Sequence, residues 1–207
     1  MGRIGEIYSE DNENPEGCVS RNPLFLGIRT GLWDIKVATA DQRFIGDLRL
    51  LARNNLALDL LVGPDQLDQV AQVSAAVPDL RVVIDHCANV RVDGKAPPAK
   101  WADGIHQLAT YRNVNMKVSG LVEGTGRTDG SAPTDVEFYR PVLDAIWQSF
   151  GEERVIFGSN WPVSARFASY ATVFQIVRAY FQAKGPRAEE KYFTKNAQRV
   201  YRCRERG

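Results

Sequence analysis

Histidine and cysteine are scarce in this sequence. Its 207 residues include only two histidines, His86 and His106, and three cysteines, Cys18, Cys87 and Cys203. An odd number of cysteines at irregular spacing argues against a disulfide framework and indicates a reducing compartment, so we expect a cytoplasmic protein.

Long apolar runs are also absent. No stretch approaches the length of a membrane-spanning helix, and the opening MGRIGEIYSEDNENPEG lacks the apolar segment of a signal peptide. Neither sign of charge dominates, since 26 lysines and arginines face 25 aspartates and glutamates and leave a net charge of +1. We therefore expect neither a membrane nor a nucleic acid as a partner.

The composition that remains, with 44% hydrophobic and 25% charged residues, is typical of a soluble globular protein. A chain of this length is enough for one substantial domain. Residues 1–20 are polar and rich in Asp, Glu, Asn and Gly, and we expect a flexible leader there. No linker divides the rest, so residues 21–207 are predicted to form one domain.

Short apolar runs alternate with segments of helical periodicity. The helix expected in residues 41–55 has one apolar face, and Asp41 is a suitable N-cap. Because strands and helices alternate and the strands are apolar throughout, the pattern predicts an α/β protein with a parallel sheet of about five strands. The expected strands are LFLGI (24–28), LALDLLVG (56–63), RVVIDHCA (81–88), VNMKVSGL (114–121) and RVIFGSN (154–160).

Polar side chains collect where the expected strands end. Arg29, His86, Lys117, Asn160 and Trp161 all stand at or near the C-terminal ends of strands, which is where parallel α/β proteins bind ligands. Arginine is a natural clamp for a substrate carboxylate. A lysine inside an apolar strand is costly unless it is paired or faces a cavity. These residues are therefore candidates for a ligand site.

Each candidate also has a structural interpretation. His86 could be a core histidine bonded to a backbone carbonyl, Trp161 could serve packing alone, and His106 lies among surface-type residues of a helix. Neighbouring strand residues face opposite ways, so we expect Asp85 to point away from His86 and to pair with a helix. The same alternation argues against a nucleophilic pair of His86 and Cys87.

Several segments together resemble a known family. In order and spacing they are similar to the amidohydrolase-related metal-dependent hydrolases, in the branch of the sugar-lactone and 2-pyrone-4,6-dicarboxylate lactonases. The resemblance covers residues 22–202 and implies a TIM-type (β/α) barrel that hydrolyses a small lactone. The segments are FLGIR, LALDLLVGPDQLDQVAQVSAAVPDLRVVIDHCANV, NVNMKVSGLVEG, RVIFGSNWPVS and NAQRVY.

The resemblance also implies roles for single residues. His86 corresponds to the histidine that polarises the substrate carbonyl or binds a divalent metal such as zinc. Asn160 stands where the family carries the aspartate that takes a proton from the attacking water. Arg29, Lys117 and Trp161 are expected to line the substrate pocket.

This chain departs from the family pattern in two ways. The His-x-His pair of the first barrel strand is missing, and a complete barrel usually needs about 250 residues. The amide of Asn160 cannot accept a proton from water at ordinary pH. We therefore expect a truncated barrel with helices outside and a lactonase-like hydrolase with little or no activity alone. The alternative is a non-catalytic protein that binds a small anionic ligand or a partner chain.

A barrel fragment of five strands leaves two sheet edges open. We therefore expect the edges near residues 24–29 and 154–160 to be covered by self-association or by a complementing N-terminal half. Alternatively, the leader could fold across the gap between the two edges, or the sheet could flatten into an open form.

Overall fold

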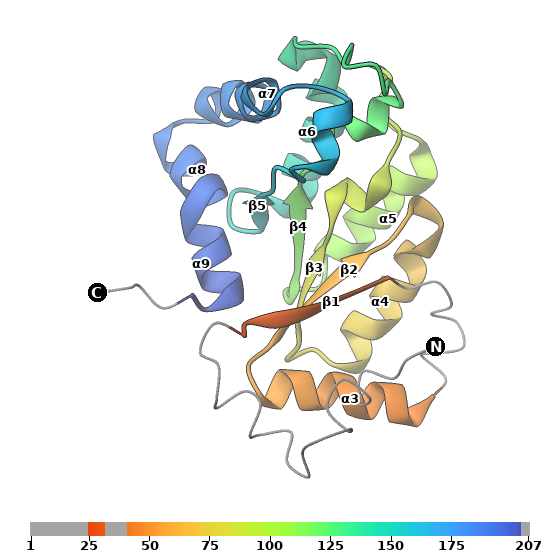
Figure 1. The fold of residues 1–207 in the computed structure, drawn as a ribbon. Coiled ribbons are helices and arrows are strands. Elements are labelled where there is room, and N and C mark those ends of the chain that lie inside the picture. Colours follow the sequence, from red (N-terminus) through yellow and green to blue (C-terminus); the bar gives the residue numbers. More distant parts are fainter. Residues whose placement is uncertain (1–24, 32–40, 204–207) are drawn as a thin grey trace.

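Five parallel strands form the centre of the computed structural model, which describes residues 25–31 and 41–203 (Figure 1). Their order in the sheet is β1-β2-β3-β4-β5, so each strand pairs with the one that follows it in the chain. This unreversed order is that of part of a (β/α) barrel, and it confirms the predicted α/β class. The strands are β1 (Gly27–Gly31), β2 (Ala57–Leu61), β3 (Arg81–Ile84), β4 (Val114–Val118) and β5 (Val155–Phe157). The expected leader, residues 1–20, lies outside the described residues.

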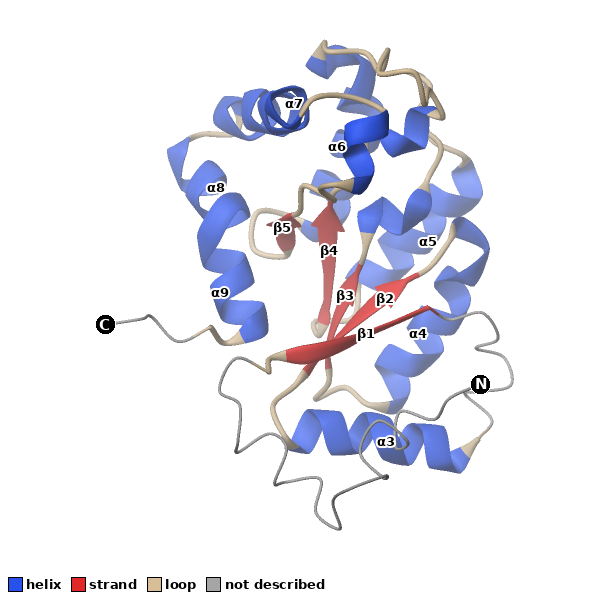
Figure 2. Ribbon diagram, viewed as in Figure 1, coloured by secondary structure: helices blue, strands red, loops and turns tan. Residues whose placement is uncertain are grey.

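Helices follow the strands in turn (Figure 2). Asp41 caps the first described helix as predicted, because its carboxylate accepts a hydrogen bond of 2.9 Å from the backbone N–H of Arg43. No helix in residues 25–31 and 41–203 has the length and apolar character to cross a membrane. The helices are α3 (Gln42–Arg53), α4 (Leu67–Ala76), α5 (Ala99–Ala109), α6 (Val136–Phe150), α7 (Tyr170–Ala183), α8 (Pro186–Glu190) and α9 (Asn196–Tyr201). A π-helical turn, Lys191–Lys195, joins α8 to α9.

The two faces of the sheet differ in chemistry because strand side chains alternate. The outer face is apolar and belongs to the main core, with Leu58, Val82 and Met116 fully buried. The inner face carries Val83 and Ile156, which form a small separate cluster with Val200 of α9. α9 therefore covers part of the inner face, on the side of the sheet away from α4 and α5 (Figure 1). The expectation that helices lie outside holds for the long helices α3 to α7, whereas the short helix α9 covers part of the inner face.

The first strand differs from its prediction. The apolar run at residues 24–28 was expected to form a buried strand with Arg29 at its C-terminal end, but β1 spans Gly27–Gly31 and none of its residues is fully buried. Pairing with β2, from Gly27 opposite Ala57 to Gly31 opposite Leu61, sets these limits. Arg29 therefore lies in the middle of the strand, where its side chain crosses the inner face.

Asn196 fixes the C-terminal helical run to the end of the sheet. Its side chain is 1% exposed and its Nδ2 donates to the backbone oxygens of Glu152 (2.7 Å) and Val155 (2.9 Å). We expect Asn196→Ala to lower the free energy of unfolding by about 1–3 kcal/mol, because both carbonyls lose their donor. Urea unfolding followed by circular dichroism measures the change. Lys195→Ala, at an exposed neighbouring position, should leave the midpoint unchanged; equal midpoints for all three proteins would contradict the assignment.

Candidate active site

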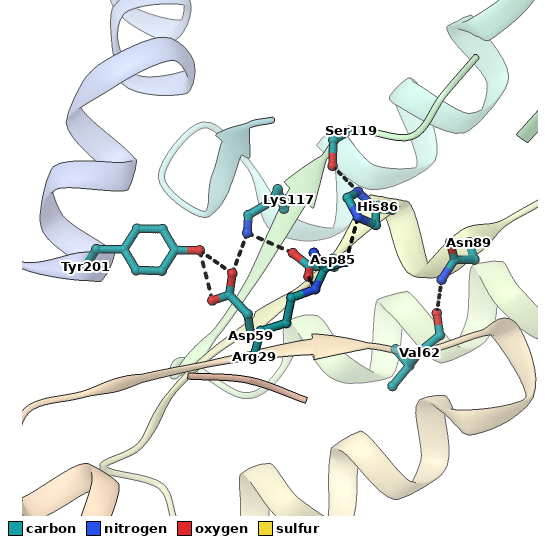
Figure 3. Close-up of polar contacts among 9 residues, drawn as sticks. All are labelled: Arg29, Asp59, Val62, Asp85, His86, Asn89, Lys117, Ser119 and Tyr201. Atoms are coloured by element: carbon teal, nitrogen blue, oxygen red, sulfur yellow. Dashed lines mark hydrogen bonds and ion pairs between the residues drawn. The ribbon is translucent and has the colours of Figure 1, made fainter. Parts of the chain in front are cut away.

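The strand register gathers charged side chains on the inner face. Arg29 lies opposite Asp59 in the sheet, and Asp59 lies opposite Val83. Asn115 of β4 lies opposite Val83, and Lys117 lies two residues beyond Asn115; Asp85, one residue after the end of β3, contacts Lys117. Residues that are two apart on a strand share a face. Arg29, Asp59, Asp85 and Lys117 therefore converge, and we refer to them as the charge cluster (Figure 3).

Lys117 is the centre of the charge cluster. Its Nζ forms an ion pair with Asp59 and another, of 2.8 Å, with Asp85 Oδ1. Arg29 Nε lies 2.8 Å from the other Asp85 oxygen. The Asp85 side chain is only 1% exposed, and these two cations are its only polar partners among the described residues. Two positive and two negative charges thus balance where an unpaired charge would cost several kcal/mol.

The geometry of the charge cluster shifts the pKa values of Lys117 and Asp59. Burial alone would lower the pKa of Lys117, but the charge of Asp59 and hydrogen bonds to both carboxylates outweigh it and raise that pKa. Burial raises the pKa of Asp59, and the ammonium of Lys117 opposes the rise. A carboxyl whose pKa is raised by folding contributes stability below its unfolded pKa and loses it as the pH rises through the folded value.

Tyr201 of α9 completes the pairing of Asp59. Its hydroxyl lies 2.7 and 2.9 Å from the two Asp59 carboxylate oxygens, and the Lys117 ammonium lies 5.6 Å from the centre of its ring. The hydroxyl donates, since the carboxylate can only accept. The last helix is thereby tied to the second strand across the inner face (Figure 3).

His86 lies beside the charge cluster and is held from two sides. Its Nε2 is 3.0 Å from Arg29 Nη2, and its Nδ1 is 2.7 Å from the Ser119 hydroxyl oxygen. Because a guanidinium only donates, Nε2 accepts and the proton resides on Nδ1, which donates to Ser119. Burial and the charges of Arg29 and Lys117 lower the pKa of His86, against the opposing charge of Asp85. The imidazole is therefore held in its neutral form.

The turn that carries His86 is strained. His86, Cys87, Ala88 and Asn89 all have φ between 50° and 54°, a left-handed conformation that costs about 1–2 kcal/mol for each residue other than glycine. The turn is held by Asn89 Nδ2, which donates to Val62 O (2.7 Å), and by the Cys87 carbonyl, which accepts from the Trp101 indole (3.0 Å). Such strain is concentrated at functional sites.

Two predictions about this turn used a wrong premise. Strand β3 ends at Ile84, so the alternation that was expected to separate Asp85, His86 and Cys87 does not apply beyond it. Asp85 pairs with Arg29 and Lys117 from neighbouring strands, and the prediction that it pairs with a helix is wrong. Cys87 is buried, and burial raises the pKa of its thiol to about 12. A thiol in that state is a poor nucleophile.

Asn160 lies after β5 and contacts Glu123, which is not among the predicted site residues. Its Nδ2 donates to Glu123 Oε1 at 2.8 Å, and its own backbone is left-handed with φ of 52°. Trp161 beside it is 47% exposed and packs edge-on against Tyr170, with ring centres 5.7 Å apart. The structure therefore joins Arg29 to His86 directly and to Lys117 through Asp85, whereas Asn160 and Trp161 have other partners.

Four contributors were missed as site residues: Asp59, Asp85, Glu123 and Tyr201. Alternation along β2 and β4 places Asp59 and Lys117 on one face, so counting positions on the strands could have paired them. Glu123 and Tyr201 carry no such signal, because each lies in a segment whose position depends on the complete fold.

The described residues do not assemble a metal site. In the part of the chain that the structure describes, no group of three or more His, Cys, Asp or Glu side chains could hold a metal ion. His86, the predicted ligand, uses both ring nitrogens for Arg29 and Ser119. The ammonium of Lys117 lies between the carboxylates of Asp59 and Asp85. Protein side chains, and not a divalent cation, supply the positive charge in this arrangement.

Comparison with known proteins gives consistent findings. The sequence profile of a family described as amidohydrolase matches residues 39–203. An L-fucono-1,5-lactonase of Burkholderia ambifaria is 31% identical to this chain, and the match covers 95% of this chain and 68% of that relative. An amidohydrolase from Burkholderia multivorans, crystallised with bound HEPES, has a TM-score of 0.82 at 26% identity and covers 94% of this chain and 72% of its own. A second crystal form of it, with bound zinc and the same coverage, has a TM-score of 0.80.

Removing the ammonium of Lys117 should destabilise the fold. Lys117→Met keeps most of the apolar stem but leaves Asp59 and Asp85 without their shared cation. We expect a loss of about 3–5 kcal/mol in unfolding free energy near pH 8. The loss should shrink toward pH 4–5, because the Asp59 pKa rises further in the variant and its neutral form is the one that the fold tolerates. Urea unfolding at the two pH values measures both effects.

Lys100→Met is the matched control. Lys100 also pairs with an aspartate, since its Nζ lies 2.6 Å from Asp65 Oδ1, but both side chains are exposed. Exposed ion pairs contribute little, so this variant should unfold like the wild type at both pH values. Equal stability of Lys117→Met and Lys100→Met would show that the charge cluster is not a stabilising centre.

Proposed function

Because this chain belongs to the amidohydrolase family, we propose that it hydrolyses the ester bond of a small lactone of the sugar-acid or dicarboxylic-acid class. The observation that carries the proposal is the 31% identity with an L-fucono-1,5-lactonase across 95% of this chain. The positions of His86 just after β3 and of Ser119 just after β4 support it, because parallel α/β enzymes bind substrates at the carboxyl ends of their strands.

Arg29 and His86 are assigned to the substrate carbonyl. The Arg29 side chain is 51% exposed, so its guanidinium retains N–H groups that can face a substrate while Nε pairs with Asp85. His86 holds Nη2 of this guanidinium and fixes its direction. The free N–H groups of Arg29 polarise the lactone carbonyl and bind the carboxylate or hydroxyl groups of the substrate, and His86 acts through Arg29 as a positioning residue. Lys117 is already paired with two carboxylates, so it contributes to the pocket mainly by holding them.

Hydrolysis also requires a water molecule to attack the carbonyl carbon. The C–O bond of the ring then breaks, and the product is an open-chain hydroxy acid. Asn160 can accept a hydrogen bond from that water through its side-chain oxygen, but it cannot take the proton. Trp161, with its exposed ring, stays a proposed wall of the pocket.

A non-catalytic role is the second candidate, and Asn160 is the observation that favours it. A protein that kept the pocket and lost its base would bind a small anionic ligand through Arg29 and release it unchanged. It would show an increase in melting temperature with the ligand and no ring opening. Self-association also stays a proposal, supported by the outer edges of β1 and β5, with which no described strand pairs.

The proposed reaction is tested with the purified chain on a panel of aldono-1,4-lactones, aldono-1,5-lactones and dicarboxylate lactones, with acid release followed by a pH indicator. We expect turnover of at least one lactone and a loss of about 100-fold or more in kcat/KM for His86→Asn, since the carbonyl loses its oriented partner. His106→Asn is the matched control, because this second histidine is exposed on α5. Binding of a lactone without ring opening would support the non-catalytic role, and equal losses in both variants would refute the assignment of His86.

A further inference from the structure

Glu123 is the carboxylate whose surroundings differ from those of its neighbours. Asp59 and Asp85 are each paired with at least one cation. Glu123 forms no ion pair among the described residues. Its Oε1 accepts from Asn160, and its Oε2 is buried with no hydrogen-bond partner in the described part of the chain. A buried oxygen left in this way needs an explanation, and catalysis is one of the recognised explanations.

The backbone places Glu123 next to the His86 turn. It lies in a short 3₁₀ turn, Glu123–Thr125, which begins five residues after β4 ends. The turn folds back through a 3.0 Å hydrogen bond from Gly124 N to Gly120 O. Gly120 has φ of 66°, and a Cβ there would lie 2.8 Å from the His86 Cβ. Only glycine allows the loop that carries Glu123 to pack so closely on the histidine.

The loop after β5 brings Asn160 to the same place. Gly158 packs against Ser119, the partner of His86, and a Cβ at Gly158 would lie 2.9 Å from the Ser119 Cβ. Two residues later, Asn160 donates to Glu123. The loops that follow β3, β4 and β5 thus present His86, Glu123 and Asn160 at one edge of the sheet.

The electrostatics of Glu123 suit proton transfer. Burial raises its pKa, and hydrogen bonds from its own backbone N–H and from Asn160 oppose that rise. The charge of Glu123 in turn raises the pKa of Cys87, the residue next to His86, so its field reaches the His86 turn. A carboxylate with a raised pKa is a better base near neutral pH than an ordinary glutamate.

We propose that Glu123 is the general base of this site, and that it takes the place of the aspartate expected at position 160. The inference rests on the proposed lactone hydrolysis. The Glu123 carboxylate accepts one proton as the water oxygen bonds to the carbonyl carbon. When the ring C–O bond breaks, the same carboxyl returns that proton to the departing ring oxygen, which becomes the hydroxyl of the product. No other reactant is needed, and the hydrogen bond from Asn160 to Oε1 holds the carboxylate in place.

In this assignment, Glu123 and Asn160 can exchange their roles as carboxylate and amide. A family member with Asp at position 160 would place the carboxylate on the loop after β5, whereas this chain places it on the loop after β4. The amide and the carboxylate are in hydrogen-bond contact at 2.8 Å, and we expect that contact to persist when the two side chains exchange roles. The double variant Glu123→Gln, Asn160→Asp therefore restores a carboxylate and an amide in contact, with the partners reversed.

The experiment compares kcat/KM and its pH dependence in three variants with the wild type, on the lactone that the wild type hydrolyses best. Glu123→Gln should lose about 100-fold to 10,000-fold, the usual effect of losing a general base. The double variant should recover at least tenfold over Glu123→Gln. Glu137→Gln is the matched control, since Glu137 is an exposed glutamate paired with Arg140 on α6, and it should keep wild-type activity.

The pH profile separates catalysis from structure. For a general base, kcat/KM rises with pH through the pKa of the active carboxylate, and that rise should be absent from Glu123→Gln and present again in the double variant. If Glu123→Gln does not fold, the double variant carries the test, because it keeps the hydrogen bond.

Three results would overturn the proposal. Glu123→Gln within threefold of an active wild type would refute the role of Glu123 and leave lactone hydrolysis standing. A folded double variant no more active than Glu123→Gln, or inactive where that variant does not fold, would do the same. A wild type that binds lactones but opens none would refute the proposed function itself, and with it the base.

Discussion

The Lys117 ammonium between Asp59 and Asp85 is the interaction on which the rest of the inner face depends. Two buried carboxylates would repel each other and lose their hydration without it. Because Lys117 neutralises Asp59 and shares Asp85 with Arg29, the Arg29 side chain can pair with Asp85 and still keep about half of its surface in solvent. His86 then receives a donor on one nitrogen and has an acceptor on the other, which fixes its neutral tautomer.

The same cluster gives the C-terminal helix a polar anchor. Apolar contact between α9 and the inner face is small, with Val200 against Val83 and Ile156. The hydroxyl of Tyr201 adds a hydrogen bond to Asp59, and Asn196 ties the start of α9 to the end of the sheet. The helix therefore covers charged and apolar parts of the inner face together. Stability and the geometry of the candidate site are coupled through one set of side chains.

The candidate site of this amidohydrolase-family chain departs in two places from what the family resemblance implies. The described residues form no metal-binding group, and in the proposed function Arg29, held by Asp85 and His86, polarises the carbonyl. Where an aspartate would take a proton, the structure has Asn160 in contact with Glu123. In the proposed assignment, Glu123 supplies the proton acceptor beside Asn160, so the substitution at position 160 does not by itself remove the means of catalysis.

The sequence by itself determined the order of strands and helices, the N-cap at Asp41 and the choice of Arg29, His86 and Lys117 as candidates, because local periodicity and residue type decide these features. Tertiary structure alone decided the side on which Asp85 lies, since β3 ends one residue before it. It also decided the pairings of Tyr201 with Asp59, 142 residues apart, and of Asn160 with Glu123, 37 residues apart. Such contacts depend on how complete loops and helices pack, and no local pattern encodes the distance between them.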